Sequence, residues 1–310
     1  MQILIDDTDM GKPLSTYLKE NGFSRALTVR LKKDPRGILV NGEHVTVRYV
    51  LQKGDLLSLA AEDREDEKNP YIEPVDLPVG IVLETPDYVV ADKPAGMPTI
   101  PTHGHRDDTL ANALAFRYRD ENFIFRAVNR LDRDTSGLVL VARTRLAATF
   151  LYAQMEQKNV HKEYLAILSG SLPEDRGEIR SYIRRKGDSI IERVSLDHPE
   201  NGAQYAHTVY ETIAAKDGIT VVKASPVTGR THQLRVHFAS LGAPIAADTL
   251  YGKADPDLSR QALEAFSLSF PDPKTKETVV CKAPVADDLK LYLQKKGLYE
   301  QTEEFLDKNP

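Results

Sequence analysis

Cysteine is nearly absent from this sequence, which has a single one, Cys281, among its 310 residues. One thiol cannot form an internal disulfide, and it cannot supply the several thiolates of a cysteine-based zinc site. No apolar run comes near the roughly 18 residues that a membrane-spanning helix needs. The first ten residues carry three aspartates where a signal peptide has a basic start. We therefore expect a cytoplasmic protein that lacks disulfides and does not enter a membrane.

Motifs for common cofactors are also missing. The sequence has no phosphate-binding loop G-x-x-x-x-G-K-S/T, no G-x-G-x-x-G after a strand, no H-E-x-x-H and no G-x-S-x-G. His103 and His105 flank a glycine in a polar loop, where two solvated side chains are a simpler interpretation than a metal pair. His232 and His237 are five positions apart and would not share a helix face. An enzyme with this sequence is expected to need no metal and no other cofactor.

An excess of positive charge is missing too, since 41 lysines and arginines oppose 46 aspartates and glutamates. Taken alone, this balance argues against a nucleic-acid partner, which needs clustered basic residues. Residues 1–60, however, hold nine basic and seven acidic residues, whereas residues 61–80 hold two basic and seven acidic ones. The net charge of −5 therefore equals that of one short acidic segment, and local basic patches for RNA are compatible with the sequence.

The composition, with 41% hydrophobic and 28% charged residues, is that of a globular protein with one large domain, or a large and a small one. Residues 61–79 interrupt it with three prolines, many charges and no periodic apolar pattern. We interpret this stretch as a linker between a small domain at residues 1–60 and a large one at residues 80–310. A surface strap on a single domain is the alternative.

The first 60 residues carry the pattern of two helices followed by a hairpin. Apolar residues recur at helical spacing over residues 14–18, and a second helix begins near Arg25. Asn41-Gly42, between apolar runs, predicts a tight turn into a strand over residues 44–49. The second helix presents a cluster of basic side chains, which are Arg25, Arg30, Lys32, Lys33 and Arg36.

This order, with the turns V-N-G and K-G-D, resembles the alpha-L RNA-binding domain, a small α/β unit. The first helix departs from the family pattern, because Lys12-Pro13-Leu14 replaces the usual Arg-Leu-Asp start. The alternative is an α/β appendage whose basic face is only solvated. The resemblance implies that the unit binds RNA through four of the basic side chains, Arg25, Arg30, Lys32 and Lys33.

Beyond residue 80, strand and helix patterns are mixed without regular βαβ alternation. A continuous apolar run at residues 138–142 predicts a strand that is buried on both faces. Gly242 is expected just after the end of a helix. The mixture predicts an α+β fold with a mixed, largely antiparallel sheet. We expect further strands within residues 80–90, 163–168, 206–212 and 219–224, and helices at residues 110–118, 145–157 and 231–241.

The segment before the buried strand reads N-R-L-D-R-D-T-S-G at residues 129–137. Aspartate, serine and threonine at the entrance of a strand are often only turn formers. A carboxylate held against a guanidinium, however, has a lowered pKa and stays ionised. Such a carboxylate can attack an electrophilic carbon, and glycosidic carbons are typical targets. Spacing alone favours the turn, whereas the chemistry favours a reactive aspartate.

The same segment resembles the pattern H-R-L-D-x-x-T-S-G of the RluA-type pseudouridine synthases. Every fixed position matches except the first, which is Asn129 instead of histidine. The resemblance implies a pseudouridine-synthase-like catalytic domain in which Asp132 is the catalytic residue. It also implies that Arg130 helps to hold a flipped nucleotide.

Further segments fit this family in the expected order. Residues 161–166, H-K-E-Y-L-A, resemble the K-x-Y-L-A segment whose tyrosine lies against the target base, a role that falls to Tyr164. Taken alone, this tyrosine would be read as an ordinary half-buried strand residue. Residues 93–96, K-P-A-G, and the D-x-x-Y-G at residues 248–252 also fit, whereas Glu264 stands where many members carry histidine.

Residues 229–237, G-R-T-H-Q-L-R-V-H, match the family nearly letter for letter. We expect Arg235 to be the catalytic salt-bridge partner of Asp132, with Arg230 as the alternative. A surface ion pair, which contributes little, is the ordinary interpretation of either arginine. The resemblance assigns substrate binding within this segment to Arg230, His232 and Gln233.

The family reaction breaks the N1–C1′ bond of uridine, turns the uracil and joins C5 to C1′, so it needs no redox cofactor or energy donor. The target base must leave its stack to reach a pocket. Tyr164 would stack on it, and Arg130 would fill the space that it leaves in the RNA. Asp132 would attack C1′ or abstract the C2′ proton to give a glycal, and both routes stay open.

The expected partner is structured RNA, with ribosomal RNA favoured and transfer RNA as the second candidate, and the expected state is a monomer. A non-catalytic RNA-binding protein is one alternative, and it would predict a broken active-site segment. A metal-dependent nuclease using Asp132 and Asp134 is another. It is disfavoured because alternate residues of a strand point to opposite faces.

Overall fold

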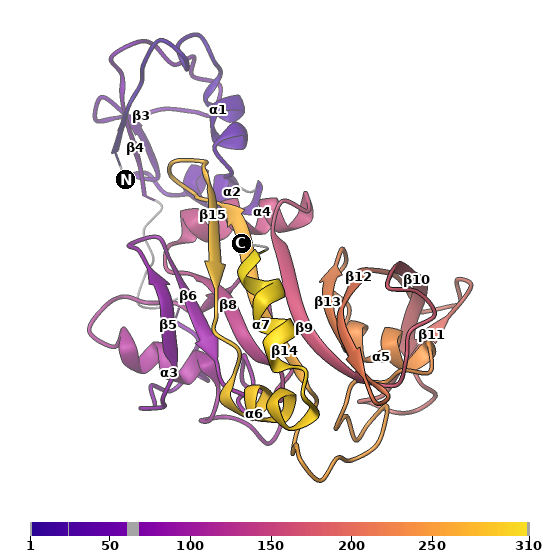
Figure 1. The fold of residues 1–310 in the computed structure, drawn as a ribbon. Helices are drawn as coiled ribbons and strands as arrows, with labels where there is room; N and C mark the ends of the chain where they lie inside the picture. Colours follow the sequence, from indigo (N-terminus) through magenta and orange to yellow (C-terminus); the bar gives the residue numbers. More distant parts are fainter. Residues whose placement is uncertain (1, 24, 61–67, 309–310) are drawn as a thin grey trace.

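The computed structural model describes residues 2–23, 25–60 and 68–308, which form two sheets with their helices (Figure 1). The expected linker at residues 61–79 therefore lies partly outside the described residues. The N-terminal unit has one antiparallel four-stranded sheet in the order β1-β4-β2-β3. Its elements are β1 (Gln2–Leu4), α1 (Leu14–Glu20), α2 (Arg25–Lys33), β2 (Ile38–Val40), β3 (Glu43–His44) and β4 (Leu56–Leu59).

The two expected helices and the hairpin are present in this unit. Asn41 and Gly42 have φ values of 52° and 86°, as a two-residue turn of type I′ requires. The strand expected over residues 44–49 is wrong beyond His44. There the backbone caps α1 instead, because the carbonyls of Val47 and Tyr49 accept hydrogen bonds from the first amides of that helix.

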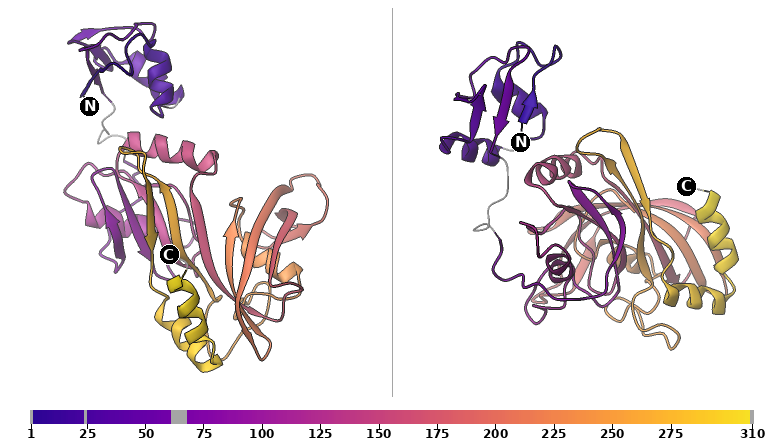
Figure 2. Two further views of the ribbon diagram at one scale, coloured as in Figure 1. Left: turned by 45° about the horizontal axis from the view of Figure 1, so that its top comes forward. Right: turned by 90° about the vertical axis from the view of Figure 1, so that its left-hand side faces the viewer.

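The N-terminal unit packs against α4 (Arg145–Glu156) of the larger unit, and both views of Figure 2 place it beside that helix. Leu146 joins the apolar core of the unit. Gly22 lies so close to α4 that a Cβ atom there would be 3.3 Å from the Cα of Phe150. Contact with α4 therefore depends on a residue that has no side chain.

The larger unit is built on an 11-stranded sheet whose main path is β11-β10-β12-β13-β9-β14-β8-β6-β5. Among the described residues, β8 and β14 form its one parallel pair, and the other pairs are antiparallel. The strands are β5 (Gly80–Glu84), β6 (Tyr88–Lys93), β7 (Arg126–Ala127), β8 (Ser136–Ala142), β9 (His161–Ser169), β10 (Arg176–Arg185), β11 (Arg193–Leu196), β12 (Gln204–Lys216), β13 (Ile219–Pro226), β14 (Leu263–Pro271) and β15 (Thr278–Lys282).

Helices cover this sheet in separate places. α4 packs on β8 and β14, α5 packs on the β10–β13 half, and α7 packs on β12 (Figure 1). Gly242 has a φ of 77° just after α5, as expected for the end of that helix. None of the described helices is long and apolar enough to cross a membrane. The remaining helices are α3 (Leu110–Arg117), α5 (Gln233–Ser240), α6 (Asp287–Lys296) and α7 (Tyr299–Lys308).

Candidate active site

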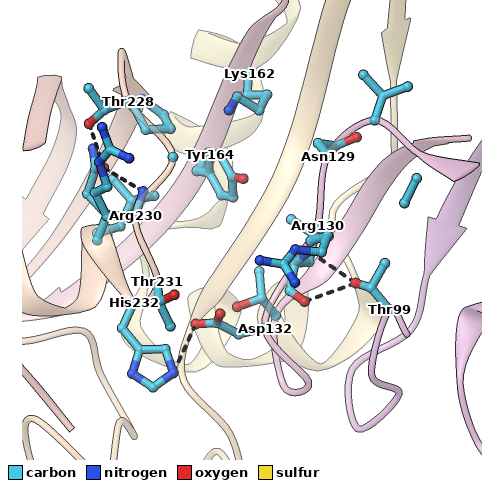
Figure 3. A pocket seen from close by; sticks show the side chains of 18 of the residues that line it. Thr99, Asn129, Arg130, Asp132, Lys162, Tyr164, Thr228, Arg230, Thr231 and His232 are labelled. Carbon is cyan, nitrogen blue, oxygen red and sulfur yellow. Dashed lines mark hydrogen bonds and ion pairs between the residues drawn. The ribbon is translucent and has the colours of Figure 1, made fainter. Parts of the chain in front are cut away.

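A cavity of about 890 Å³ opens where the two halves of the large sheet meet (Figure 3). One wall is the loop that precedes β8, and the facing wall is formed by β9 and the start of α5. The end of α4 also reaches it, through Met155 and Glu156. Residues from five distant parts of the chain therefore converge on this cavity, which contains Asp132.

Two polar side chains hold the backbone on either side of Asp132. The hydroxyl of Thr99 accepts from the amide of Leu131 at 3.1 Å and donates to its carbonyl at 3.0 Å. The buried amide of Asn129 donates to the Leu138 carbonyl at 3.1 Å and accepts from the Leu140 amide at 2.8 Å. Asn129 thus fastens the loop to β8, where the family pattern has a histidine.

Lys93 also holds the loop that carries Asp132. Its fully buried ammonium donates to the carbonyls of Pro94, Met97 and Arg133 at 2.7 to 3.0 Å. Burial lowers the pKa of Lys93 to about 7. The three hydrogen bonds join the K-P-A-G loop to the residue that follows Asp132.

Gly137, at the start of β8, has a φ of 109°. A Cβ atom at this position would overlap the backbone of Ala265 on the parallel strand β14. Both the conformation and the space therefore require glycine at this end of the motif. The glycine that ends the motif is thus explained by the parallel contact of β8 with β14.

The Asp132 carboxylate lies next to Arg235, as expected from the sequence. Arg235 Nη1 is 3.4 Å from Asp132 Oδ2. The same guanidinium binds Asp248 more closely, with 2.7 Å from Nε to Oδ2 and 2.9 Å from Nη2 to Oδ1. The side chain of Asp248 is fully buried, whereas that of Asp132 is 28% exposed. Arg235 therefore has a buried structural partner and an accessible one.

His232 also lies beside Asp132 (Figure 3). Its Nε2 is 3.9 Å from Asp132 Oδ2, and its Nδ1 is 2.8 Å from the hydroxyl of Tyr251. Burial lowers the pKa of His232, which favours the neutral ring. Asp248 and Tyr251 belong to the D-x-x-Y-G segment, which sequence reasoning noted without assigning a role to either.

Tyr164 and Lys162 line the cavity from β9, across from Arg130 (Figure 3). Tyr164 is buried, and its burial together with the Asp132 carboxylate raises its pKa. Burial lowers the pKa of Lys162, which sequence reasoning did not assign to the site. Arg130 is exposed, and its side chain makes no hydrogen bond or ion pair with any residue of the described part of the chain. It is thus available to an incoming ligand.

Arg230 and Gln233 line the cavity but are bound elsewhere. Arg230 donates to the Tyr205 carbonyl at 3.0 Å and to Gln204 Oε1 at 3.1 Å, so Arg235 rather than Arg230 contacts Asp132. The Gln233 amide accepts two hydrogen bonds, from Thr228 and from the Arg230 backbone. It also donates two, to His207 and Thr208. Its full hydrogen-bonding capacity is therefore used within the protein.

The basic residues of α2 lie in the N-terminal unit, outside the cavity. Arg25, Lys32 and Lys33 are exposed, and Arg30 is half-buried. Within the described ranges, no group of three or more histidine, cysteine, aspartate or glutamate side chains could hold a metal ion. The cavity thus brings the accessible carboxylate of Asp132 together with an arginine, a histidine and a tyrosine.

Residues 87–240 match a family model described as RNA pseudouridylate synthase. Over 88% of this chain, the sequence is 36% identical to an uncharacterized RNA pseudouridine synthase of Bacillus subtilis (strain 168), YjbO, and the match covers 95% of that protein. This chain belongs to the RNA pseudouridine synthase family.

The synthase is also 35% identical to ribosomal large subunit pseudouridine synthase D of Xanthomonas campestris pv. campestris, over 93% of this chain and 90% of that protein. A solved structure of human RNA pseudouridylate synthase domain containing 1 is 28% identical, with a TM-score of 0.54. The match covers 70% of this chain and 86% of the human chain. The expected family, α+β fold and enzyme class, an RNA-modifying isomerase, are confirmed.

Proposed function

We propose that this synthase isomerises specific uridines of ribosomal RNA and that Asp132 is its catalytic carboxylate. The observation that carries the proposal is the position of Asp132, which is held by Arg235 yet accessible from the cavity. An ionised carboxylate at this place can attack C1′ of a flipped nucleotide or remove its C2′ proton. Both routes begin from the same Asp132 position.

The other cavity residues receive roles from their contacts. Tyr164 offers an aromatic face for the uracil, and Arg130, which is exposed and unpaired within the described chain, can replace the flipped base in the RNA. We assign Arg230 and Gln233 to positioning of the cavity wall, because their polar groups bind the protein itself. His232 approaches Asp132 and is a candidate contact to the sugar.

The choice of ribosomal RNA rests on two supports. The relative from Xanthomonas campestris is named for the large ribosomal subunit. A separate N-terminal unit with exposed basic side chains on α2 suits a large structured RNA. We propose that residues 1–60 form this RNA-binding domain, residues 61–79 the linker and residues 80–310 the catalytic domain of a monomer. Transfer RNA is the second candidate.

The test compares pseudouridine maps of total RNA from cells with the wild-type gene, a deletion, Asp132→Asn and Asp134→Asn. Asp134 is the matched control, because its carboxylate pairs with Arg133 and does not contact Arg235. The proposal expects one uridine of ribosomal RNA to lose its mark in the deletion and in Asp132→Asn, but not in Asp134→Asn.

Other outcomes separate the parts of the proposal. A mark that is lost in the deletion but retained in Asp132→Asn would disprove the role of Asp132. A mark lost only from transfer RNA would disprove the substrate. Unchanged maps would be followed by an assay of the purified enzyme on ribosomal and transfer RNA transcripts. Inactivity there would favour the alternative of a non-catalytic RNA-binding protein.

A further inference from the structure

The hydroxyl of Tyr251 connects a backbone amide with a side chain of the active site. It accepts a hydrogen bond from the Arg193 amide at 2.8 Å and lies 2.8 Å from His232 Nδ1. Arg193 begins β11, and its guanidinium also holds the preceding turn by binding the carbonyls of Ile191 and Glu192. The amide that meets Tyr251 is therefore fixed by its surroundings.

The protons of this chain of contacts can be assigned. A backbone amide can only donate, so the Tyr251 oxygen is the acceptor toward Arg193. The phenol has one proton of its own, and His232 Nδ1 is its one remaining partner among the described residues. If Nδ1 carried a proton, the phenolic proton would have no acceptor, which is costly at a partly buried site. Nδ1 is thus the acceptor, and the ring proton is on Nε2.

The charges around His232 agree with a neutral ring. Burial lowers its pKa, and Arg235 and Arg193 lower it further. Asp132 and Asp248 act in the opposite direction, but their charges are shared with Arg235. A neutral His232 whose Nδ1 accepts from Tyr251 must present an Nε2–H group on its other side.

We propose that Tyr251 is a positioning residue that fixes His232 in the Nε2–H tautomer and directs this N–H toward Asp132. The proposal rests on the proposed role of Asp132. His232 has a left-handed backbone with a φ of 58° and a ψ of 19°, which is unfavourable for a residue with a side chain. Such strain at the rim of a cavity is typical of a residue that is held for function.

The two carboxylate oxygens of Asp132 differ in their contacts, which bears on the oxygen that reacts. Arg235 Nη1 donates a hydrogen bond to Oδ2 at 3.4 Å, and His232 Nε2 lies 3.9 Å from the same oxygen, beyond hydrogen-bond distance. Oδ1 forms no hydrogen bond or ion pair within the described part of the chain. Arg235 donates to Oδ2 and His232 approaches the same oxygen, which leaves Oδ1 open to the nucleotide. Tyr251 thereby selects the reactive oxygen through His232, without touching the substrate.

The test is Tyr251→Phe, which removes only the hydroxyl. The ring that lies 5.1 Å from the Arg235 guanidinium and 5.7 Å from His232 is retained. Nitrogen-15 NMR of histidine-labelled protein, assigned with His232→Asn, should show the Nε2–H tautomer in the wild type and a mixture in Tyr251→Phe. The value of kcat should fall about tenfold with KM unchanged, as the loss of one aligned hydrogen bond implies.

Tyr88→Phe is the matched control, because this buried tyrosine also has a bonded hydroxyl, 2.8 Å from Asp272, and neither residue lines the cavity. It should change neither the tautomer nor kcat. A protonated Nδ1 in the wild type, or an unchanged tautomer in Tyr251→Phe, would overturn the proposal. The NMR readout needs no RNA, so an inactive wild-type enzyme would contradict the proposed function while the tautomer is still decided.

Discussion

Asp248 holds the Arg235 guanidinium at two points and leaves its Nη1 directed at Asp132. The two carboxylates differ in their environment, since the Asp248 side chain is fully buried and the Asp132 side chain is 28% exposed. A guanidinium that is already anchored loses little freedom when it meets a second carboxylate. Arg235 can therefore place Asp132 and still leave it open to substrate.

This relationship predicts the effect of Asp248→Asn. The amide cannot balance the buried charge of Arg235, so the guanidinium loses its fixed orientation. We expect kcat to fall about 100-fold. The free energy of unfolding should fall by about 3 kcal/mol. Single-turnover kinetics and urea denaturation measure the two quantities.

Asp257→Asn is the control for Asp248→Asn. Asp257 pairs with Lys295 and Lys296 at the surface, where ion pairs contribute little. Its substitution should alter neither quantity. If Asp248→Asn retained full activity, Asp248 would not be the residue that orients Arg235.

A second prediction concerns Asn129, which donates to Leu138 and accepts from Leu140. In Asn129→Asp the donor is replaced by a carboxylate oxygen that faces the Leu138 carbonyl. The buried repulsion and the lost hydrogen bond should lower the free energy of unfolding by about 3 kcal/mol. Urea denaturation measures it. Asn159→Asp, at an exposed asparagine, should have little effect, and equal losses in the two variants would contradict the structural role of Asn129.

Local sequence patterns revealed much of the fold and less of the site. The apolar run at residues 138–142 became β8, and the Asn41-Gly42 turn formed as expected. Strand β10 was not predicted, because its charged residues obscure the alternation of buried and exposed positions. The C-terminal helices α6 and α7 were also missed. They are rich in charge and bury few side chains, so their apolar pattern is weak.

In the site, the contact of Asp132 with Arg235 was predicted from the family resemblance and not from spacing. The partners Asp248 and Tyr251 were missed as functional residues, because only the tertiary fold brings them to the start of α5. Gln233 was expected to bind substrate. Its side-chain amide, however, already makes four hydrogen bonds within the protein. Sequence letters do not show which polar groups are already used.

From the pKa shifts of two buried side chains, Glu264 and His237, we predict opposite effects of pH on the free energy of unfolding. Burial raises the pKa of Glu264 to about 7 from 4.5, so the folded state favours its neutral form. This contribution is complete below about pH 4.5 and is lost as the pH rises through 7. Burial lowers the pKa of His237 to about 4 from 6.5, so its contribution is complete above 6.5 and is lost as the pH falls toward 4.

Glu264→Gln should remove the first dependence and leave the second. Relative to the wild type, the variant should gain about 3 kcal/mol in free energy of unfolding between pH 4.5 and pH 7.5. His237→Asn should change the slope in the opposite direction. Urea denaturation at a series of pH values measures both. Parallel curves for the wild type and Glu264→Gln would show that Glu264 has an ordinary pKa in the folded protein.

The last prediction tests RNA binding by the N-terminal unit through salt. Each phosphate that a basic residue neutralises adds about 0.7 to 0.9 to the slope of log affinity against log salt concentration. The double variant Lys32→Gln and Lys33→Gln should therefore lower this slope by about 1.5 for ribosomal RNA, while kcat on a short stem-loop that contains the target uridine is unchanged. Lys295→Gln with Lys296→Gln removes the same charge from α6, which lies at the end of the larger unit opposite the N-terminal unit (Figure 1), and should leave the slope as it is. If both double variants lowered the slope equally, the effect would come from overall charge. RNA recognition would then not reside in the basic face of α2.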